Sequence, residues 1–216
     1  MTAITFFDTY APLLLSGLWA TLRICFLATV LALPLGLGVA LLLRSRYRPL
    51  KALGRLYVEV MRGTPILVVL FLLYYGGPSI GLVLEAEPVG IIGLGLYGAG
   101  YFAEIFRAGL QSIAQGQREA ARMLGIPNWR ILTRIELPQM RRLVTPPVIN
   151  QVIVLIKESA ALSIITVPEL TKIGAQIANE TFAVIEPYLA VALLYWLLIE
   201  LFAIAGHWLE RKAAHG

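Results

Sequence analysis

Two ionisable residues lie side by side in a stretch that is otherwise apolar: Lys157 and Glu158, followed by the hydroxyls of Ser159 and Ser163. A charge in an apolar layer is costly, so such residues usually contact a substrate, an ion pathway or an opposite charge. Adjacent side chains on a helix point about 100° apart, so these two are poorly placed to neutralise only each other. Two interpretations stay open: a substrate-facing role, and packing at a subunit interface.

A second charged pair, Glu104 and Arg107, has the i, i+3 spacing that brings opposite charges to one helix face. Glu59 and Arg62 have the same spacing earlier in the chain. We expect an ion pair within each set, near the ends of apolar segments where long side chains reach water. Structural pairing is the favoured interpretation, and Glu104 and Arg107 are also candidates for a substrate pathway.

Other kinds of chemistry have little support. The pattern G-x-G-x-x-G at 93–98 lies inside an apolar run with no strand before it, so close helix packing is favoured over dinucleotide binding. The sequence contains no G-x-x-x-x-G-K-[ST] loop, so we expect the chain itself not to bind ATP. One cysteine, Cys25, excludes an internal disulfide, and the two histidines have no partners at metal-ligand spacing. We expect no catalytic group, no metal site and no cofactor in this chain.

The elements that hold these residues are apolar runs. The chain of 216 residues is 58% hydrophobic and only 14% charged, whereas a soluble domain carries about 25% charged residues. Each run meets the ~20 residues that a helix needs to cross a hydrocarbon layer, and the runs cover about 11–43, 58–77, 88–110, 143–166 and 187–209. This predicts an all-α integral membrane protein of about five transmembrane helices, in a single domain over 1–216.

The charged links predict the orientation of these helices. Basic residues gather at 44–55, at 111–142 and in the tail after 210, whereas the opposite links carry mainly acids. Lys and Arg concentrate in cytoplasmic links, so the N-terminus should lie outside and the C-terminus in the cytoplasm. The net charge of +5 is therefore a sign of membrane topology, and we expect no nucleic acid partner.

The link at about 111–140 has a structure of its own. Good helix formers at 117–124 are followed by Gly125, which supplies the left-handed residue that ends a helix, and by Pro127, which prevents the helix from resuming. Asn128 is placed to cap a second short helix, and Pro138 marks its end. We expect two short amphipathic helices at an angle.

The surface of this link allows two interpretations. Ala120 and Ala121 leave room for another backbone to approach, and apolar side chains stand among arginines at Leu124, Ile131, Leu132 and Ile135. Such a helix fits a groove on another protein, and it equally fits the surface of an anionic membrane. Composition and spacing alone favour neither.

The same residues resemble a known family. Glu119-Ala120-Ala121, then Gly125, then Ile135-x-Leu137-Pro138 resembles the EAA loop of the membrane subunits of bacterial ABC importers. We call residues 111–140 the EAA-like loop. Further matches point to the polar amino acid permeases of the histidine, glutamine and arginine uptake type, over about residues 13–210; they are Arg62-Gly63-Thr64-Pro65, Ala103-Glu104, Arg107-Ala108-Gly109, Gly116-Gln117 and Val167-Pro168-Glu169-Leu170. The family has Lys-Asp-Thr-Ser or similar at Lys157, and the departure here leaves the substrate open.

The resemblance implies a type I ABC importer permease in the bacterial plasma membrane. Its EAA loop would dock a dimer of separate ATPase subunits, which hold the ATP and Mg²⁺, through Gly116, Glu119, Ala120, Ala121, Gly125, Ile135, Leu137 and Pro138. The pathway for a polar amino acid would involve Lys157, Glu158, Ser159, Ser163, Glu104 and Arg107. A second permease, identical or paralogous, and an extracytoplasmic solute-binding protein complete the expected assembly. The alternative is an ion-coupled secondary transporter or channel that uses Lys157 and Glu158.

Overall fold

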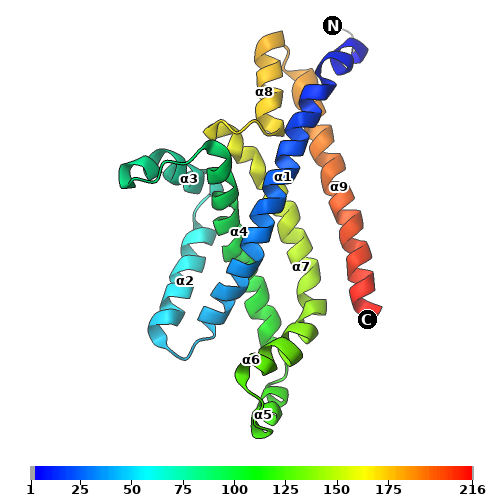
Figure 1. The fold of residues 1–216 in the computed structure, drawn as a ribbon. Helices are drawn as coiled ribbons and strands as arrows, with labels where there is room; N and C mark the ends of the chain where they lie inside the picture. The colour runs from blue at the N-terminus through cyan, green and yellow to red at the C-terminus, as the bar shows by residue number, and fades with distance from the viewer. Residues whose placement is uncertain (1–2, 216) are drawn as a thin grey trace.

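A computed structural model describes residues 3–215, and all regular structure in that range is helical (Figure 1). The helices are α1 (Ala3–Leu43), α2 (Arg48–Gly63), α3 (Ile66–Phe71), α4 (Ala86–Gln111), α5 (Gln115–Met123), α6 (Asn128–Ile131), α7 (Leu137–Glu158), α8 (Leu170–Thr181) and α9 (Ile185–His215). Short π-helical or 3₁₀ segments follow three of these helices. Leu72–Gly76 and Gly77–Ile80 follow α3, Leu132–Glu136 follows α6, and Ser159–Ile165 follows α7. The predicted all-α membrane fold is confirmed: within the described residues four helices are long and apolar enough to span a bilayer, and a bent pair supplies a fifth span.

The bent pair corrects the second predicted span. The apolar run at 58–77 was expected to form one straight helix, but the chain turns by 107° between Arg48–Gly63 and Ile66–Ile80. Thr64 is extended, with φ −107° and ψ 130°, and Pro65 follows it. A residue before proline is pushed out of the helical region, and proline has no N–H to continue the helix. As a result, α3 and the segment after it project sideways from the bundle, to the left of α4 in Figure 1.

Helix α4 lies between α1, α2 and α7 (Figure 1), and its glycines explain why. A Cβ added at Gly95 would lie 2.6 Å from a side-chain carbon of Leu31 on α1, and one at Gly93 would lie 2.7 Å from Leu70 on α3. Without those atoms the neighbouring helices approach closely. The packing interpretation of the glycine pattern at 93–98 is therefore confirmed.

Helix α8 lies at the end of the bundle opposite α5 and α6 (Figure 1). Its first turn is capped by the buried carboxylate of Glu169, which accepts hydrogen bonds from the backbone N–H of Thr171 at 2.8 Å and of Lys172 at 2.7 Å. Tyr195 on α9 donates to the same carboxylate at 2.8 Å, and the Leu170 N–H donates to Thr21 on α1 at 3.2 Å. These bonds hold α8 against both α1 and α9.

Helix α1 is the longest element, with 41 residues and internal prolines at Pro12 and Pro34. It packs along α4, and it also contacts α8 through its early turns, where Leu14 joins a buried cluster with Leu170 and Ile173. Arg23, a charge within this helix, is paired: it lies 2.7 Å from Glu87 in the first turn of α4.

Candidate functional site

The EAA-like loop forms the end of the bundle farthest from α8 (Figure 1). Helix α5 ends where the sequence predicts, because Gly125 is left-handed with φ +74°. The Gly125 N–H donates to the carbonyl of Arg122 at 2.9 Å, and the Ile126 N–H donates to the carbonyl of Ala121 at 3.0 Å. This pair of bonds is a Schellman motif, which satisfies the last carbonyls of a helix.

The second half of the loop differs from the prediction. Asn128 does not cap the next helix; it is the first helical residue, and extended Pro127 occupies the capping position. Pro138 does not end that helix either, because it lies in the first turn of α7, where no backbone N–H is needed. The two short helices expected are thus one short helix, α5, and the beginning of a 38-residue helical stretch, Asn128–Ile165.

A π-helical turn makes this continuity possible. Over Leu132–Glu136 the helix widens, and the Leu137 N–H bonds back to the carbonyl of Leu132, five residues earlier. A π turn inserts one extra residue into a helix, and such turns are frequent at functional sites. The extra residue changes the direction of the side chains that follow, including Glu136.

The predicted docking residues are not equally accessible. Those that are exposed include the Glu119 carboxylate, which accepts a hydrogen bond from Gln115 at 2.6 Å; the others are Gly116, Ala120, Gly125 and Pro138. Ile135 and Leu137 are half-buried, and Ala121 is buried.

The most exposed apolar side chains flank the turn at Gly125. Met123 is 88% and Leu124 is 79% exposed, and Trp129 stands nearby with the guanidinium of Arg130 at 5.1 Å from its ring. Ile131, expected to be an anchor for a partner, is instead buried. The prediction named Leu124 but missed Met123 and Trp129. Both lie close to the Gly-Ile-Pro break, and this position could have indicated that they are exposed.

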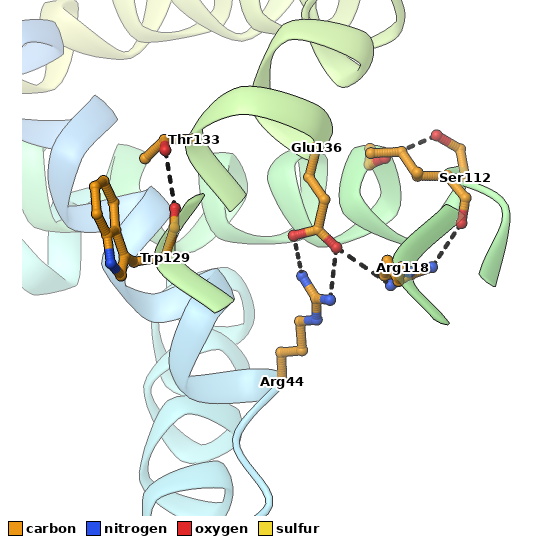
Figure 2. A network of polar contacts seen from close by, with 8 residues as sticks. Arg44, Ser112, Arg118, Trp129, Thr133 and Glu136 are labelled. Carbon is orange, nitrogen blue, oxygen red and sulfur yellow. Dashed lines mark hydrogen bonds and ion pairs between the residues drawn. The ribbon is translucent and has the colours of Figure 1, made fainter. Parts of the chain in front are cut away.

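Behind the loop lies an ion network that the sequence analysis missed (Figure 2). The carboxylate of Glu136 accepts one hydrogen bond from each terminal nitrogen of Arg44, both at 2.6 Å. Arg118 on α5 approaches the same carboxylate to 3.7 Å. The hydrogen bonds to Glu136 raise the pKa of the Arg44 guanidinium above its ordinary value. No spacing signal could reveal this pair, because Arg44 and Glu136 are 92 positions apart.

An open cleft of about 810 Å³ separates the EAA-like loop from the link after α1. Apolar side chains of α1 and α2 line one side, and Arg122, Gly125 and Ile131 line the other. Arg44 and Glu136 form its inner wall.

The second predicted group, Glu104 with Arg107, is formed as expected. The Arg107 Nη2 atom lies 2.7 Å from Glu104 Oε2, and its Nε lies 3.0 Å from Oε1. The pair predicted between Glu59 and Arg62 is not seen in the described part of the chain. Arg62 instead reaches α4, 4.0 Å from Glu104 and 5.5 Å from the centre of the Tyr101 ring.

These side chains form a polar stripe on α4, which we define as Tyr97, Tyr101, Glu104, Arg107 and Gln111. The two tyrosine hydroxyls are 3.1 Å apart, and Arg107 donates to Gln111 at 2.7 Å. Spacings of three and four residues place all five on one helix face. An open cleft of about 430 Å³ between this stripe and α2 is lined by Lys51, Arg55, Glu59, Arg62, Glu104, Arg107 and Gln111, among others.

The third predicted group lies where α7 changes to a 3₁₀ segment. Lys157 is exposed and Glu158 is half-buried. Leu155, one turn before Glu158, packs against Gly98, the residue after Tyr97 of the stripe. Ser159 is fully buried and donates to the carbonyl of Ile156, while Ser163 donates to that of Ala160, both at 2.7 Å. Of the predicted pathway residues, the structure therefore joins Glu104 to Arg107 and sets Glu158 at the other end of the stripe.

Comparison with known proteins gives consistent matches. The family model described as "Binding-protein-dependent transport system inner membrane component" matches residues 32–215. The probable amino-acid ABC transporter permease protein YckA of Bacillus subtilis (strain 168) is 38% identical over 204 residues, which are 94% of this chain and 90% of that protein. The arginine transport system permease protein ArtQ of the same organism is 33% identical over 202 residues, with 93% and 92% covered.

Solved structures agree with the sequence relatives. A crystal structure of an amino acid ABC transporter with histidines superposes with a TM-score of 0.89 at 35% identity, and covers 98% of this chain and 99% of that one. The inward-facing MetNI methionine ABC transporter, at 23% identity and a TM-score of 0.82, shares the fold over 95% of this chain and 98% of its own. The chain therefore belongs to the family of inner membrane components of binding-protein-dependent transport systems, the permease subunits of ABC importers.

Proposed function

We propose that this chain forms part of the transmembrane pathway for a polar amino acid, and that a separate ATPase docks on its EAA-like loop to drive the transport cycle. The observation that carries the docking proposal is the apolar tip of the loop, defined by Met123, Leu124 and Trp129. These three side chains are exposed at the end of the bundle and stand among arginines. Exposed anchors of this kind fit a groove on a protein partner.

The shape of α5 argues against a membrane-surface role. A helix that lies on lipid needs a broad apolar face. The exposed residues of α5 are mostly polar or small, namely Gln115, Gly116, Gln117, Glu119 and Ala120. Its apolar contact is confined to the tip, which suits a small pocket better than a lipid surface.

The stripe on α4 suits a zwitterionic substrate. The Glu104 carboxylate offers an acceptor for an α-ammonium group, and Arg62 and Arg107 offer donors for an α-carboxylate, all at the edge of the same cleft. Glu158 at the other end of the stripe would meet a polar side chain. The names of the relatives, which include arginine and glutamine systems, support an amino acid as the substrate.

The exposed surfaces are consistent with three further partners: a second permease, a solute-binding protein and the ATPase. Outside the bundle, α3 and the segment after it present exposed apolar side chains at Leu72, Ile80 and Val83. A second permease, identical or paralogous, would cover part of this surface. The α8 end would face outward to a solute-binding protein, the EAA-like loop would face the cytoplasm, and ATP with Mg²⁺ would be held by the ATPase.

The docking proposal is tested by charge reversal at Glu119 with a matched control. Glu119 accepts a hydrogen bond from Gln115 four residues earlier, and Glu180 on α8 accepts the same kind of bond from Gln176 at the opposite end of the bundle. We expect Glu119→Lys to weaken ATPase binding in a pull-down at least tenfold, and Glu180→Lys to leave it unchanged. Equal binding by both variants would contradict docking on α5.

A transport assay tests the ion-coupled alternative. Vesicles that contain the chain without its ATPase are loaded with a sodium or proton gradient, and uptake of labelled amino acids is measured. We expect no uptake above that of empty vesicles. Gradient-driven uptake that is lost in Glu158→Gln would overturn the ATP-driven proposal.

A further inference from the structure

The Glu136 carboxylate is buried behind the EAA-like loop, and its side chain is only 2% exposed. Both of its oxygens are engaged by Arg44, whose two hydrogen bonds match the planar fork of a guanidinium to a carboxylate. Removing Arg44 would leave the buried Glu136 charge without its main partner, which is strongly unfavourable. The pair is therefore a firm connection between the segments that carry it.

Those segments come from distant parts of the chain. Arg44 directly follows α1, and Glu136 lies in the π turn that leads into α7. Arg118 on α5 approaches Glu136 with one nitrogen, and with another it donates to the carbonyl of Ile113, just after α4, at 2.6 Å. One carboxylate thus stands where the ends of α1, α4 and α7 meet the loop (Figure 2).

The two arginines hold Glu136 with unequal strength. The contacts from Arg44 are 2.6 Å, whereas the Arg118 contact of 3.7 Å is too long for a hydrogen bond. The Nε atom of Arg118 is also buried with no hydrogen-bond partner. The link from Glu136 to α1 is therefore tight, and the link from Glu136 to α5 is loose.

The tight link meets the chain at the π turn. A π turn adds one residue to a helix and often lies at a functional site. Glu136 is the last residue of this turn, and Arg44 holds it from outside the helix.

We propose that Glu136 is a positioning residue for coupling: its pair with Arg44 makes the α6–α7 segment move as one body with α1. Arg118 keeps α5 attached to the end of α4 while allowing it to shift against Glu136. This inference rests on the proposed docking of an ATPase on the EAA-like loop. Glu136 does not touch the ATPase in this scheme; it transmits the motion of the loop to the spans.

The test measures coupling rather than binding, in the complete transporter reconstituted in vesicles with its ATPase and binding protein. For Glu136→Gln we expect ATPase binding within about twofold of wild type and continued ATP hydrolysis. The number of substrate molecules transported per ATP should fall at least tenfold. Glu136→Asp keeps the charge, so its number of substrate molecules transported per ATP should lie between those of wild type and Glu136→Gln.

Two further variants show whether a loss of coupling is specific to the Arg44–Glu136 pair or reflects general damage to the fold. In the double variant Arg44→Gln/Glu136→Gln, the arginine left unpaired by the single change is removed, so the double variant should lose no more coupling than Glu136→Gln alone. Glu87→Gln breaks the partly exposed ion pair with Arg23 on the other part of α1, and should leave the transport-to-ATP ratio unchanged. If Glu136→Gln does not assemble, Arg44→Gln takes its place, because Arg44 is partly exposed.

The outcomes distinguish the two proposals. A wild-type chain that binds no ATPase would contradict the docking proposal. Normal binding together with an unchanged transport-to-ATP ratio in both Glu136→Gln and Arg44→Gln would contradict only the role of Glu136. An equal loss in Glu87→Gln would also contradict it, because the effect would then not belong to this pair.

Discussion

At the scale of single residues, Gly125 and the charges along α4 have different physical constraints. Gly125 has a positive φ of +74°, and a Cβ added there would meet no atom within 4 Å. Any penalty for substitution is therefore conformational and not steric. Glu104 is constrained in the other way, because it is held by its ion pair with Arg107.

Replacing Gly125 by valine should misdirect α5 without disturbing the spans. A residue with a Cβ loses about 1–2 kcal/mol in the left-handed region, so ATPase binding should weaken on the order of tenfold while membrane insertion stays normal. The control is Gly81→Val, because Gly81 also has positive φ (+80°) and open space around it, but lies outside the EAA-like loop, between α3 and α4. ATPase affinity is measured for both in a pull-down series. Equal affinities for the two variants would show that the turn at Gly125 does not orient a docking surface.

Replacing Glu158 by glutamine tests the pathway at the far end of the stripe. The change removes a half-buried negative charge and keeps the shape of the side chain. We expect the apparent affinity for cationic amino acids to fall at least threefold relative to neutral ones, with ATPase binding unaffected. Uptake kinetics across a panel of amino acids give the measurement. Identical kinetics across the panel would remove Glu158 from the pathway.

At the scale of elements, the contact between α1 and α4 sets the positions of the other helices. Gly36 on α1 is the tightest point that can be tested cleanly, because a Cβ there would lie 2.6 Å from Phe102 and 3.1 Å from backbone atoms of α4. Backbone atoms cannot move aside as a flexible side chain can. Gly38, two residues on, has no atom within 4 Å of the same added carbon.

Substituting these two glycines should give opposite results. Gly36→Ala overpacks the contact and should destabilise the fold by about 1–3 kcal/mol. Gly38→Ala should leave stability unchanged or raise it by about 0.5–1 kcal/mol, because alanine suits a helix interior better than glycine. Thermal unfolding of the protein in detergent compares the two variants with wild type. A similar melting shift in both would mean that α1 and α4 are not held at this distance.

The sequence predicted those elements that depend on neighbouring residues. Gly125 and Pro127 act locally, so the end of α5 could be placed from the sequence, and the i, i+3 spacing of Glu104 and Arg107 predicted their pair. The break at Thr64–Pro65 carried a local signal as well, but the apolar run that follows it was joined to the last turn of α2. The pair of Glu136 with Arg44 could not be predicted, because the two residues lie far apart in the chain.

At the scale of the whole molecule, exposed apolar side chains lie along the long helices α1 and α9, and basic residues gather in the links at 44–55 and 111–142. Trp208, near the end of α9, is exposed. Tryptophan gathers where hydrocarbon meets water. The basic links, rather than the tryptophans, support an orientation with the EAA-like loop in the cytoplasm.

Single cysteines test that orientation. Ser79, between α3 and α4, and Thr133, in the EAA-like loop, are exposed, while the native Cys25 is buried and should not react. In right-side-out vesicles, a membrane-impermeant thiol reagent should label Ser79→Cys and leave Thr133→Cys unlabelled until the vesicles are opened. Labelling in the reverse order would invert the topology.

Helix α1 is longer than the hydrocarbon layer is thick, and this affects the position of α8. At a rise of 1.5 Å per residue its 41 residues measure roughly 62 Å, about twice the hydrocarbon thickness of ~30 Å. Even a tilt of about 40°, the upper end of the usual range, leaves a vertical height near 47 Å. About 17 Å of the helix therefore lies beyond the acyl chains, shared between its two ends. Leu14 in the early turns of α1 packs against Leu170 and Ile173 of α8, so any excess length at the N-terminal end of α1 moves α8 toward the water.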